Sequence, residues 1–162
     1  MRKINIIYVG GIKAGEKYYR ETIDEYAKRL SGEFKIADIE IKEEPLPQNP
    51  NASEIAACLF AEGKKILGKA GAGAFKIALC PEGKKLTSEA FASLLYCEKT
   101  ENSKSLDFIV GSSHGLSGEV KQSADYLLSL SDMTFSHRLA RVMLFEQLYR
   151  AYAIETGRKY CK

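Results

Sequence analysis

The chain has 162 residues, of which 45% are hydrophobic and 28% charged, and this size and composition fit one globular domain with little room for a second. Its formal net charge of +3 does not by itself require a nucleic-acid partner. No apolar run approaches the length of a membrane span, and the brief apolar run after Lys3 lacks the small-residue cleavage site of a signal peptide. We therefore expect a cytoplasmic protein with no membrane partner.

The cysteines and histidines do not form a recognisable metal-binding pattern. None of the four cysteines belongs to a C-x-x-C pair, and the chain has only two histidines. Zinc sites need four such ligands at characteristic spacings, and disulfides are rare in the cytosol. The sequence therefore predicts neither a metal site nor a disulfide framework.

Strand and helix patterns alternate along the first half of the chain. Apolar runs predict strands, and apolar residues at helical spacing predict amphipathic helices. Ser53 is placed where a helix N-cap would be, with Glu54 favourable near the positive end of that helix. The predicted elements are a strand at 4–9, a helix at 16–30, a strand at 34–41, a proline-rich loop at 43–51 and a helix from Ser53 to about Lys69.

The same alternation continues in the second half. The predicted elements are a strand at 75–80, a turn at 81–84, a helix at 88–99, strands at 106–110 and 126–130, and a helix at 136–156. This order predicts an α/β fold, a three-layer sandwich with a mainly parallel sheet. The last helix is apolar nearly all round, so we expect it to pack on the sheet on one side and on a second subunit on the other.

Residues 111–115 read Gly-Ser-Ser-His-Gly and follow a predicted strand, as does the G-x-S-x-G nucleophile elbow of α/β-hydrolases. Asp125 or Asp132, followed by His137, would complete a Ser-Asp-His order with Ser113. However, three fixed positions recur readily by chance in a turn rich in Gly and Ser, and little chain remains after the elbow to carry the partners. A serine hydrolase using Ser113 is the weaker hypothesis.

The alternative is a ligand pocket formed by two loops that follow strands. Gly111 and Gly115 allow backbone to approach a ligand closely, and loops at the carboxyl ends of parallel strands are where ligands bind. The segment 130–135 offers backbone groups for the edge of an adenine ring, with Leu130, Met133 and Phe135 to enclose its faces. The residues alone predict a site for an adenosine-like or other small ligand.

Several segments resemble the ribosomal large-subunit methyltransferase H family of SPOUT methyltransferases. In the last third they are F-I-V-G-x-x-x-G-L at 108–116, L-S-x-M-T-F-x-H at 130–137, Arg141, E-Q-x-Y-R-A at 146–151 and G-x-x-Y at 157–160. Val9-Gly10, Tyr18, Tyr26, Arg29-Leu30 and the G-K-x-L-x-S-E stretch at 83–89 are similar too. The resemblance covers essentially the whole chain.

This resemblance implies a single SPOUT domain over 1–162, with a trefoil knot within about 105–162. It implies a homodimer that binds S-adenosyl-L-methionine and methylates N3 of a pseudouridine in 23S rRNA of the 70S ribosome, with no metal. The implied cofactor contacts are Leu79, Gly111, Leu130, Ser131, Asp132, Met133, Thr134 and Phe135. The implied catalytic residues are His137, Arg141, Tyr160 and Cys161.

Each polar candidate also has a structural interpretation. His137 could contact substrate or serve as a partner at the start of a helix. Arg141 could neutralise phosphate, whereas Arg150 is better explained by an ion pair with Glu146 at i+4 spacing. Both readings of His137 stay open, and the functional one is favoured for Arg141.

Two departures from the family pattern concern the site. Ser112 stands where the family usually has a second glycine, and Cys161 stands where it typically has a histidine after Tyr160. A thiol cannot match imidazole as a proton acceptor at neutral pH. A ribosome-binding homologue with weak turnover is therefore a third hypothesis.

Overall fold

The computed structural model describes residues 1–160, so the predicted site residue Cys161 lies outside the described residues. The strands are β1 (Arg2–Val9), β2 (Phe34–Ile41), β3 (Phe75–Lys85), β4 (Leu106–Val110) and β5 (Tyr126–Ser129). The helices are the 3-10 turn η1 (Ala14–Glu16) and α1 (Lys17–Leu30), α2 (Ala52–Lys69), α3 (Ser88–Leu95), α4 (Glu98–Glu101), α5 (Gly118–Ser123) and α6 (His137–Glu155).

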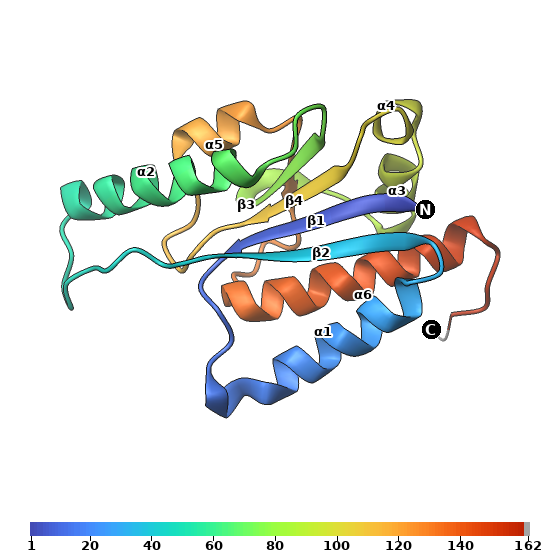
Figure 1. Cartoon of the computed structure of the whole chain (residues 1–162), viewed down its shortest axis with the longest axis horizontal. Helices are drawn as coiled ribbons and strands as arrows, with labels where there is room; N and C mark the ends of the chain where they lie inside the picture. Colours follow the sequence, from blue (N-terminus) through green and yellow to red (C-terminus); the bar gives the residue numbers. More distant parts are fainter. Residues whose placement is uncertain (161–162) are drawn as a thin grey trace.

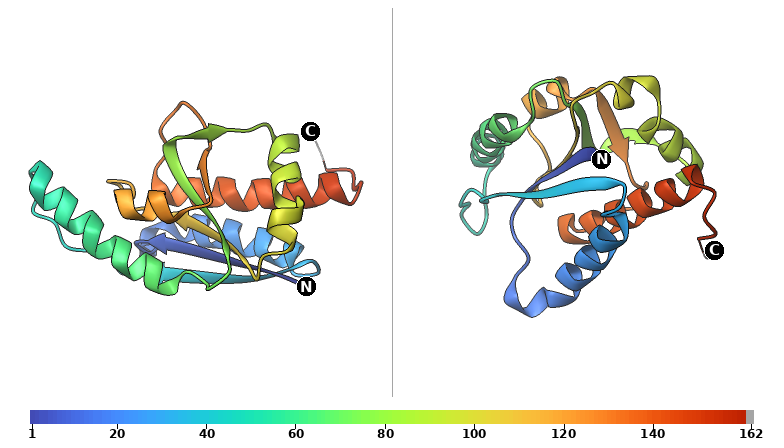
Figure 2. Two further views of the ribbon diagram at one scale, coloured as in Figure 1. Left: turned by 90° about the horizontal axis from the view of Figure 1, so that it is seen from above. Right: turned by 45° about the vertical axis from the view of Figure 1, so that its right-hand side comes forward.

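The five strands form one sheet in the order β2-β1-β4-β3-β5, and every pairing between neighbouring strands is parallel. Helices α2 and α5 cover one face of the sheet, and α1 and α6 cover the other (Figures 1 and 2). The predicted α/β sandwich with a mainly parallel sheet is confirmed. The knot that the resemblance implies stays a prediction.

Alternate residues of the central strand β1 enter two separate apolar cores. Ile4, Ile6 and Tyr8 belong to the core beneath α1, α3 and α6, whereas Ile7 and Val9 belong to the core beneath α2 and α5. Strands of a parallel sheet covered on both faces are apolar along their whole length. This is why 4–9 is apolar except for Asn5, which is buried and donates a hydrogen bond to Asp107.

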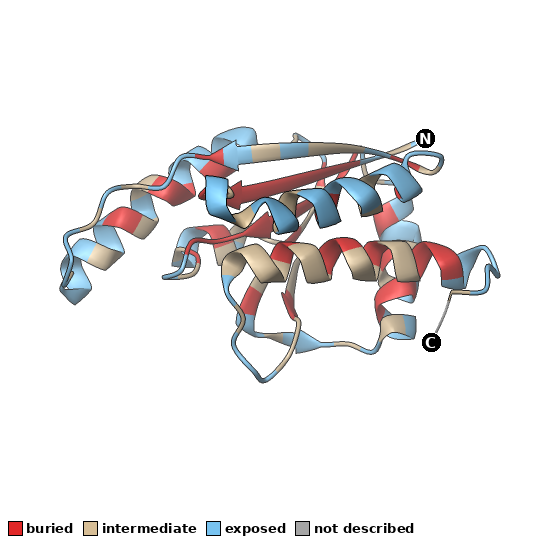
Figure 3. Cartoon of the chain, turned by 90° about the horizontal axis from the view of Figure 1, so that it is seen from below, coloured by how far each residue is buried: buried red, intermediate tan, exposed pale blue. Residues whose placement is uncertain are grey.

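Helix α6 lies between α1 and α3 and crosses beneath β4. Figure 3 shows it as a mixture of buried and half-buried residues, while the outer surface of α1 is largely exposed. The prediction that α6 packs on the sheet is confirmed, and the predicted second subunit stays a prediction. Among residues 1–160, no helix is long and apolar enough to cross a membrane.

The predicted start of the second long helix was wrong. Asn51, not Ser53, is the N-cap of α2: its side chain accepts a hydrogen bond of 2.8 Å from the backbone N–H of Glu54. The Glu54 carboxylate in turn accepts from the backbone N–H of Asn51 at 2.9 Å. This reciprocal capping box satisfies two N–H groups that the first turn leaves free.

We expect Asn51→Ala to lower the free energy of unfolding by about 1 kcal/mol, because one capping acceptor is lost. Ser53→Ala is the matched control and should change it by less than about 0.5 kcal/mol. Urea denaturation of the two variants measures both values. Equal losses would contradict the cap assigned to Asn51.

Three other parts of the predicted secondary structure were wrong. The segment 81–84 does not turn the chain, because β3 continues to Lys85 and pairs again with β5 after a register shift between Leu79 and Lys84. The predicted helix at 88–99 is split into α3 and α4, since the Thr100 hydroxyl donates to carbonyls at the end of α3. Helix α5, capped by Ser117, lies between the strands predicted at 106–110 and 126–130, where no helix was predicted.

Candidate functional site

Three neighbouring strands bring several of the predicted site residues to one edge of the sheet. Leu79 of β3 pairs with Val110 on one side and Leu128 on the other. Gly111 directly follows Val110, and Leu130 follows the end of β5. Leu79 lies in β3, while Gly111 and the start of the 130–135 loop follow β4 and β5. The predicted contacts therefore belong to three adjacent strands.

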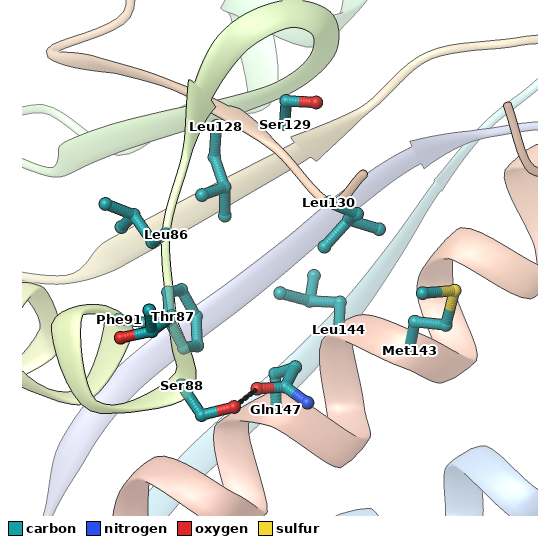
Figure 4. Close-up of a pocket in the computed structure, with 10 residues that line it drawn as sticks. All are labelled: Leu86, Thr87, Ser88, Phe91, Leu128, Ser129, Leu130, Met143, Leu144 and Gln147. Atoms are coloured by element: carbon teal, nitrogen blue, oxygen red, sulfur yellow. Dashed lines mark hydrogen bonds between the residues drawn. The ribbon is translucent and has the colours of Figure 1, made fainter. Parts of the chain in front are cut away.

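A cavity of about 290 Å³ opens beside this edge, between the end of β5, the start of α3 and the middle of α6. Figure 4 shows the side chains of Leu86, Leu128, Leu130 and Leu144 around it, with a hydrogen bond of 2.7 Å from Ser88 Oγ to Gln147 Oε1 at one side. The complete lining is Leu86, Thr87, Ser88, Phe91, Leu128, Ser129, Leu130, Met143, Leu144 and Gln147.

Of the predicted cofactor contacts, only Leu130 lines this cavity; Leu79, Gly111 and residues 131–135 do not. Sequence reasoning missed the wall formed by Leu86, Thr87 and Ser88 and the α6 residues Met143 and Gln147. A signal for the first group existed, since the stretch 83–89 belongs to the family resemblance. For α6, the apolar character on nearly all sides of the helix was interpreted as packing on the sheet and on a second subunit.

The 111–115 turn is tightly closed. The backbone N–H of Gly115, whose φ is 89°, donates to the carbonyl of Ser112 at 2.9 Å. A Cβ on Gly111 would lie 2.2 Å from the carbonyl oxygen of Gly115. Only glycine fits at position 111, because its neighbour in the turn is the backbone of Gly115; the predicted close approach to a ligand stays a prediction.

The residues proposed for a serine triad are not brought together. Ser113 is exposed in the turn, and α5 begins only at Gly118, whereas the nucleophile elbow joins a strand directly to a helix. Asp125 accepts from the backbone N–H of Lys76, and Asp132 pairs with the Lys85 ammonium. Among the described side chains, no hydrogen bond joins Ser113 to a histidine or a carboxylate.

The 130–135 loop has a local fold of its own. Ser131 Oγ accepts from the backbone N–H of Met133 at 3.0 Å, and Ser129 Oγ donates to the carbonyl of Ser131 at 3.0 Å. The Lys85 ammonium lies 2.6 Å from the Asp132 carboxylate and ties the loop to the end of β3. Met133 is 73% exposed, so its side chain is available to contact a ligand or another molecule.

His137 is the first residue of α6 and lies beside the end of β1, near Gly10 and Glu43. Its Nε2 is buried and has no hydrogen-bond partner among the described residues. Burial, followed by the charge of Arg138, lowers the pKa of His137 below its ordinary value. The imidazole is therefore neutral at pH 7, with a free ring nitrogen.

This lowered pKa makes the stability of the protein depend on pH. The unfolded chain binds a proton at His137 at a higher pH than the folded chain does, so stability falls as the pH drops below about 6.5, the ordinary histidine value. We expect His137→Gln to weaken this dependence between about pH 6.5 and 5. Urea denaturation at several pH values measures it, and an unchanged pH slope would contradict a buried, neutral His137.

Arg141 lies inside the protein rather than on its surface. It is 0% exposed, and its Nη2 donates to both carboxylate oxygens of Asp38 in β2 at 3.0 Å. Its guanidinium carbon lies 3.3 Å from the ring centroid of Tyr8 in β1. Arg141 thus binds α6 to two strands, although its Nε and Nη1 have no partner in the described part of the chain.

The end of the described chain packs on α6. The centroids of the Tyr160 and Tyr149 rings lie 4.9 Å apart. The Arg150 guanidinium lies 4.6 Å from the centroid of the Tyr160 ring. The hydrogen bond with Tyr26, followed by burial, raises the pKa of Tyr160. The predicted Arg150–Glu146 pair is present at 2.5 Å.

A chain of hydrogen bonds leads from the cavity toward Tyr160. Ser88 donates to Gln147, Gln147 donates to Glu146, and Arg150 also donates to Glu146 while stacking on Tyr160. Three hydrogen bonds thus connect the rim of the cavity to Arg150, on which Tyr160 stacks. In residues 1–160, no three His, Cys, Asp or Glu side chains form a group that could hold a metal ion.

Comparisons with known proteins identify the family. Residues 2–161 match the family model described as "Predicted SPOUT methyltransferase". A protein of Clostridioides difficile (strain 630) is 46% identical over 98% of this chain and 99% of its own length, and is named ribosomal RNA large subunit methyltransferase H. Proteins of the same name from Shouchella clausii and Streptococcus agalactiae are 42% and 41% identical, over 98% and 99% of this chain and 99% of their own lengths. The chain belongs to the SPOUT methyltransferase family and, within it, to the ribosomal RNA large subunit methyltransferase H group.

Proposed function

We propose that this protein transfers a methyl group from S-adenosyl-L-methionine to N3 of a pseudouridine in 23S rRNA of the ribosome. The observation that carries the proposal is the cavity formed by the segments that end β3 and β5 together with α3 and α6, in a SPOUT methyltransferase. The relatives' printed name supports ribosomal RNA as the substrate.

The residues at this edge fit the cofactor. The leucine side chains around the cavity suit the faces of an adenine ring, and Thr87, Ser88 and Gln147 supply a few polar groups to orient it. Gly111 allows the 111–115 turn to close tightly, because a Cβ there would meet the backbone of Gly115. We assign Leu79, Gly111 and the 130–135 loop to cofactor binding on the family resemblance, together with the cavity lining.

When bound, the sulfonium of this cofactor supplies a methyl group that is already strongly electrophilic. The protein's main task is then to hold the target base in line with it. The base must also lose the proton on N3, and we assign its acceptance to His137; its Nε2 has no hydrogen-bond partner within residues 1–160 but is buried in the single chain, so this site has to open before the base can reach it. Arg141 acts as a positioning residue for α6, and we assign Tyr160 and Cys161 of the tail to catalysis on the family resemblance alone.

We also propose a homodimer formed through α6. Outward-facing residues of this helix are only half-buried in the single chain, and several are apolar or aromatic, which is typical of a subunit interface. Between positions 141 and 150, the half-buried residues are Val142, Met143, Glu146, Gln147, Tyr149 and Arg150.

Calorimetric titration of the protein with S-adenosyl-L-methionine tests the cofactor assignment. We expect saturable binding at one site per chain. Absence of binding at high cofactor concentration would contradict the proposal. Labelling by a fluorophosphonate probe, lost in Ser113→Ala, would instead favour the serine hydrolase.

The tail sequence favours one further hypothesis, a ribosome-binding protein with weak turnover. A thiol at position 161 is a poorer proton acceptor than imidazole at neutral pH. We expect Cys161→His to raise kcat without changing cofactor affinity. An unchanged kcat would show that His137 or another group already carries the proton transfer.

A further inference from the structure

Glu62, in the middle of α2, is a buried carboxylate without a cationic partner. It is 1% exposed, and none of the ion pairs within residues 1–160 involves it. Its neighbours on the helix, including Cys58 and Ile66, are buried as well. An unpaired buried carboxylate is unfavourable unless several donors satisfy it, and an apolar residue would fill such a position more readily.

The donors to Glu62 come from two distant parts of the chain. Its Oε1 accepts from the backbone N–H of Glu44 at 3.0 Å and from the thiol of Cys58 at 3.6 Å. Its Oε2 accepts from the hydroxyl of Ser112 at 3.1 Å. The carboxylate therefore links α2 both to the chain leaving β2 and to the turn leaving β4.

The next residue of α2 approaches the other end of the same loop. A Cβ on Gly63 would lie 2.5 Å from Ser117 Oγ and 3.2 Å from Val120 Cγ2. Helix α2 thus contacts the 112–117 loop through Glu62 at its start and through Gly63 at its end. Two successive residues of the helix, Glu62 and Gly63, therefore lie against the same loop.

Ser112 transmits this contact to the predicted cofactor loop. It directly follows Gly111, is itself buried, and its carbonyl accepts the hydrogen bond that closes the turn at Gly115. The usual second glycine of the family would leave this position without a side-chain anchor. Here the hydroxyl fixes the residue at the centre of the turn.

We propose that Glu62 is a positioning residue, which acts through the Ser112 hydroxyl to hold the 111–115 turn in the shape that receives the cofactor. The cofactor part of this inference rests on the proposed function. The turn-holding part depends only on the hydrogen bond between Ser112 and Glu62.

The test is Ser112→Ala, with Ser113→Ala as the matched control, because Ser113 lies in the same turn but is exposed. Loss of a hydrogen bond to a buried carboxylate should weaken cofactor binding roughly tenfold and speed hydrogen exchange at residues 111–116 by a similar factor. The KM for the cofactor should rise while kcat stays unchanged, which loss of folded protein would not produce. Ser113→Ala, which removes no hydrogen bond to Glu62, should change hydrogen exchange at residues 111–116 by less than about twofold.

Glu62→Gln provides the second variant. If Glu62 acts through Ser112, the losses of affinity in Glu62→Gln and Ser112→Ala should not add in the double variant. Fully additive losses would overturn the inference, as would unchanged exchange in Ser112→Ala. If the wild-type protein bound no S-adenosyl-L-methionine, the proposed function would fail, while the exchange measurement would still decide whether Ser112 holds the turn.

Discussion

Gly111→Ala should reduce affinity for S-adenosyl-L-methionine by at least roughly 100-fold, because displacement of a binding loop by about 1 Å is enough for a loss of this size. The added Cβ would lie 2.2 Å from the carbonyl oxygen of Gly115 and 3.0 Å from Leu116 Cγ, so the turn has to open. The clash should also lower the free energy of unfolding by about 1–3 kcal/mol. Calorimetric titration and urea denaturation measure the two effects.

Gly118→Ala is the control for this variant. Gly118 is the first residue of α5, its φ is not positive, and a Cβ there would meet nothing within 4 Å. We expect cofactor affinity within about twofold of the wild type and no loss of stability. Wild-type affinity in Gly111→Ala would contradict the assignment of the 111–115 turn to the cofactor site.

Arg141→Met should lower the free energy of unfolding by about 3 kcal/mol, because it removes one partner of a buried ion pair. Asp38 would keep Arg20 and the hydroxyl of Tyr8, and Tyr8 would lose the guanidinium stacked on its ring. Methionine roughly preserves the packed volume, so the change reports mainly on the lost charge and hydrogen bonds. Urea denaturation at pH 7 measures it.

Arg20→Met is the matched control, since Arg20 pairs with the same carboxylate but its side chain is 40% exposed. Exposed pairs contribute less than about 1 kcal/mol, so a small loss is expected. If Arg141→Met were as mild as Arg20→Met and instead reduced only rRNA binding, Arg141 would be a phosphate contact rather than an internal positioning residue.

Most strands and helices of the fold could be predicted because the pattern of apolar residues within each segment indicates its structure. The bounds of β2 and β4 agree with the strands predicted at 34–41 and 106–110. Helix α6 follows the long apolar helix pattern. The segment 81–84 was misread because Pro81 and Gly83 are typical of turns. Its second pairing with β5 is a tertiary contact, which the local sequence does not reveal.

The predictable part of the site was its location, since glycine-rich loops after parallel strands indicate a ligand edge. The partners of the charged residues were not predictable. Arg141 pairs with Asp38, which lies 103 positions away in the sequence. Ser112 donates a hydrogen bond to Glu62, which lies 50 positions away. Nothing in the spacing of these residues signals such pairs, so an internal arginine was read as a phosphate contact and Glu62 was not considered.

Methyl transfer to purified 70S ribosomes tests the central proposal most directly. Ribosomes from a strain that makes the target pseudouridine should accept one methyl group each from labelled S-adenosyl-L-methionine, and the digested rRNA should contain N3-methylpseudouridine. Ribosomes that carry uridine at that position should accept none. Equal labelling of both kinds of ribosome, or cofactor binding without transfer to either, would contradict the account.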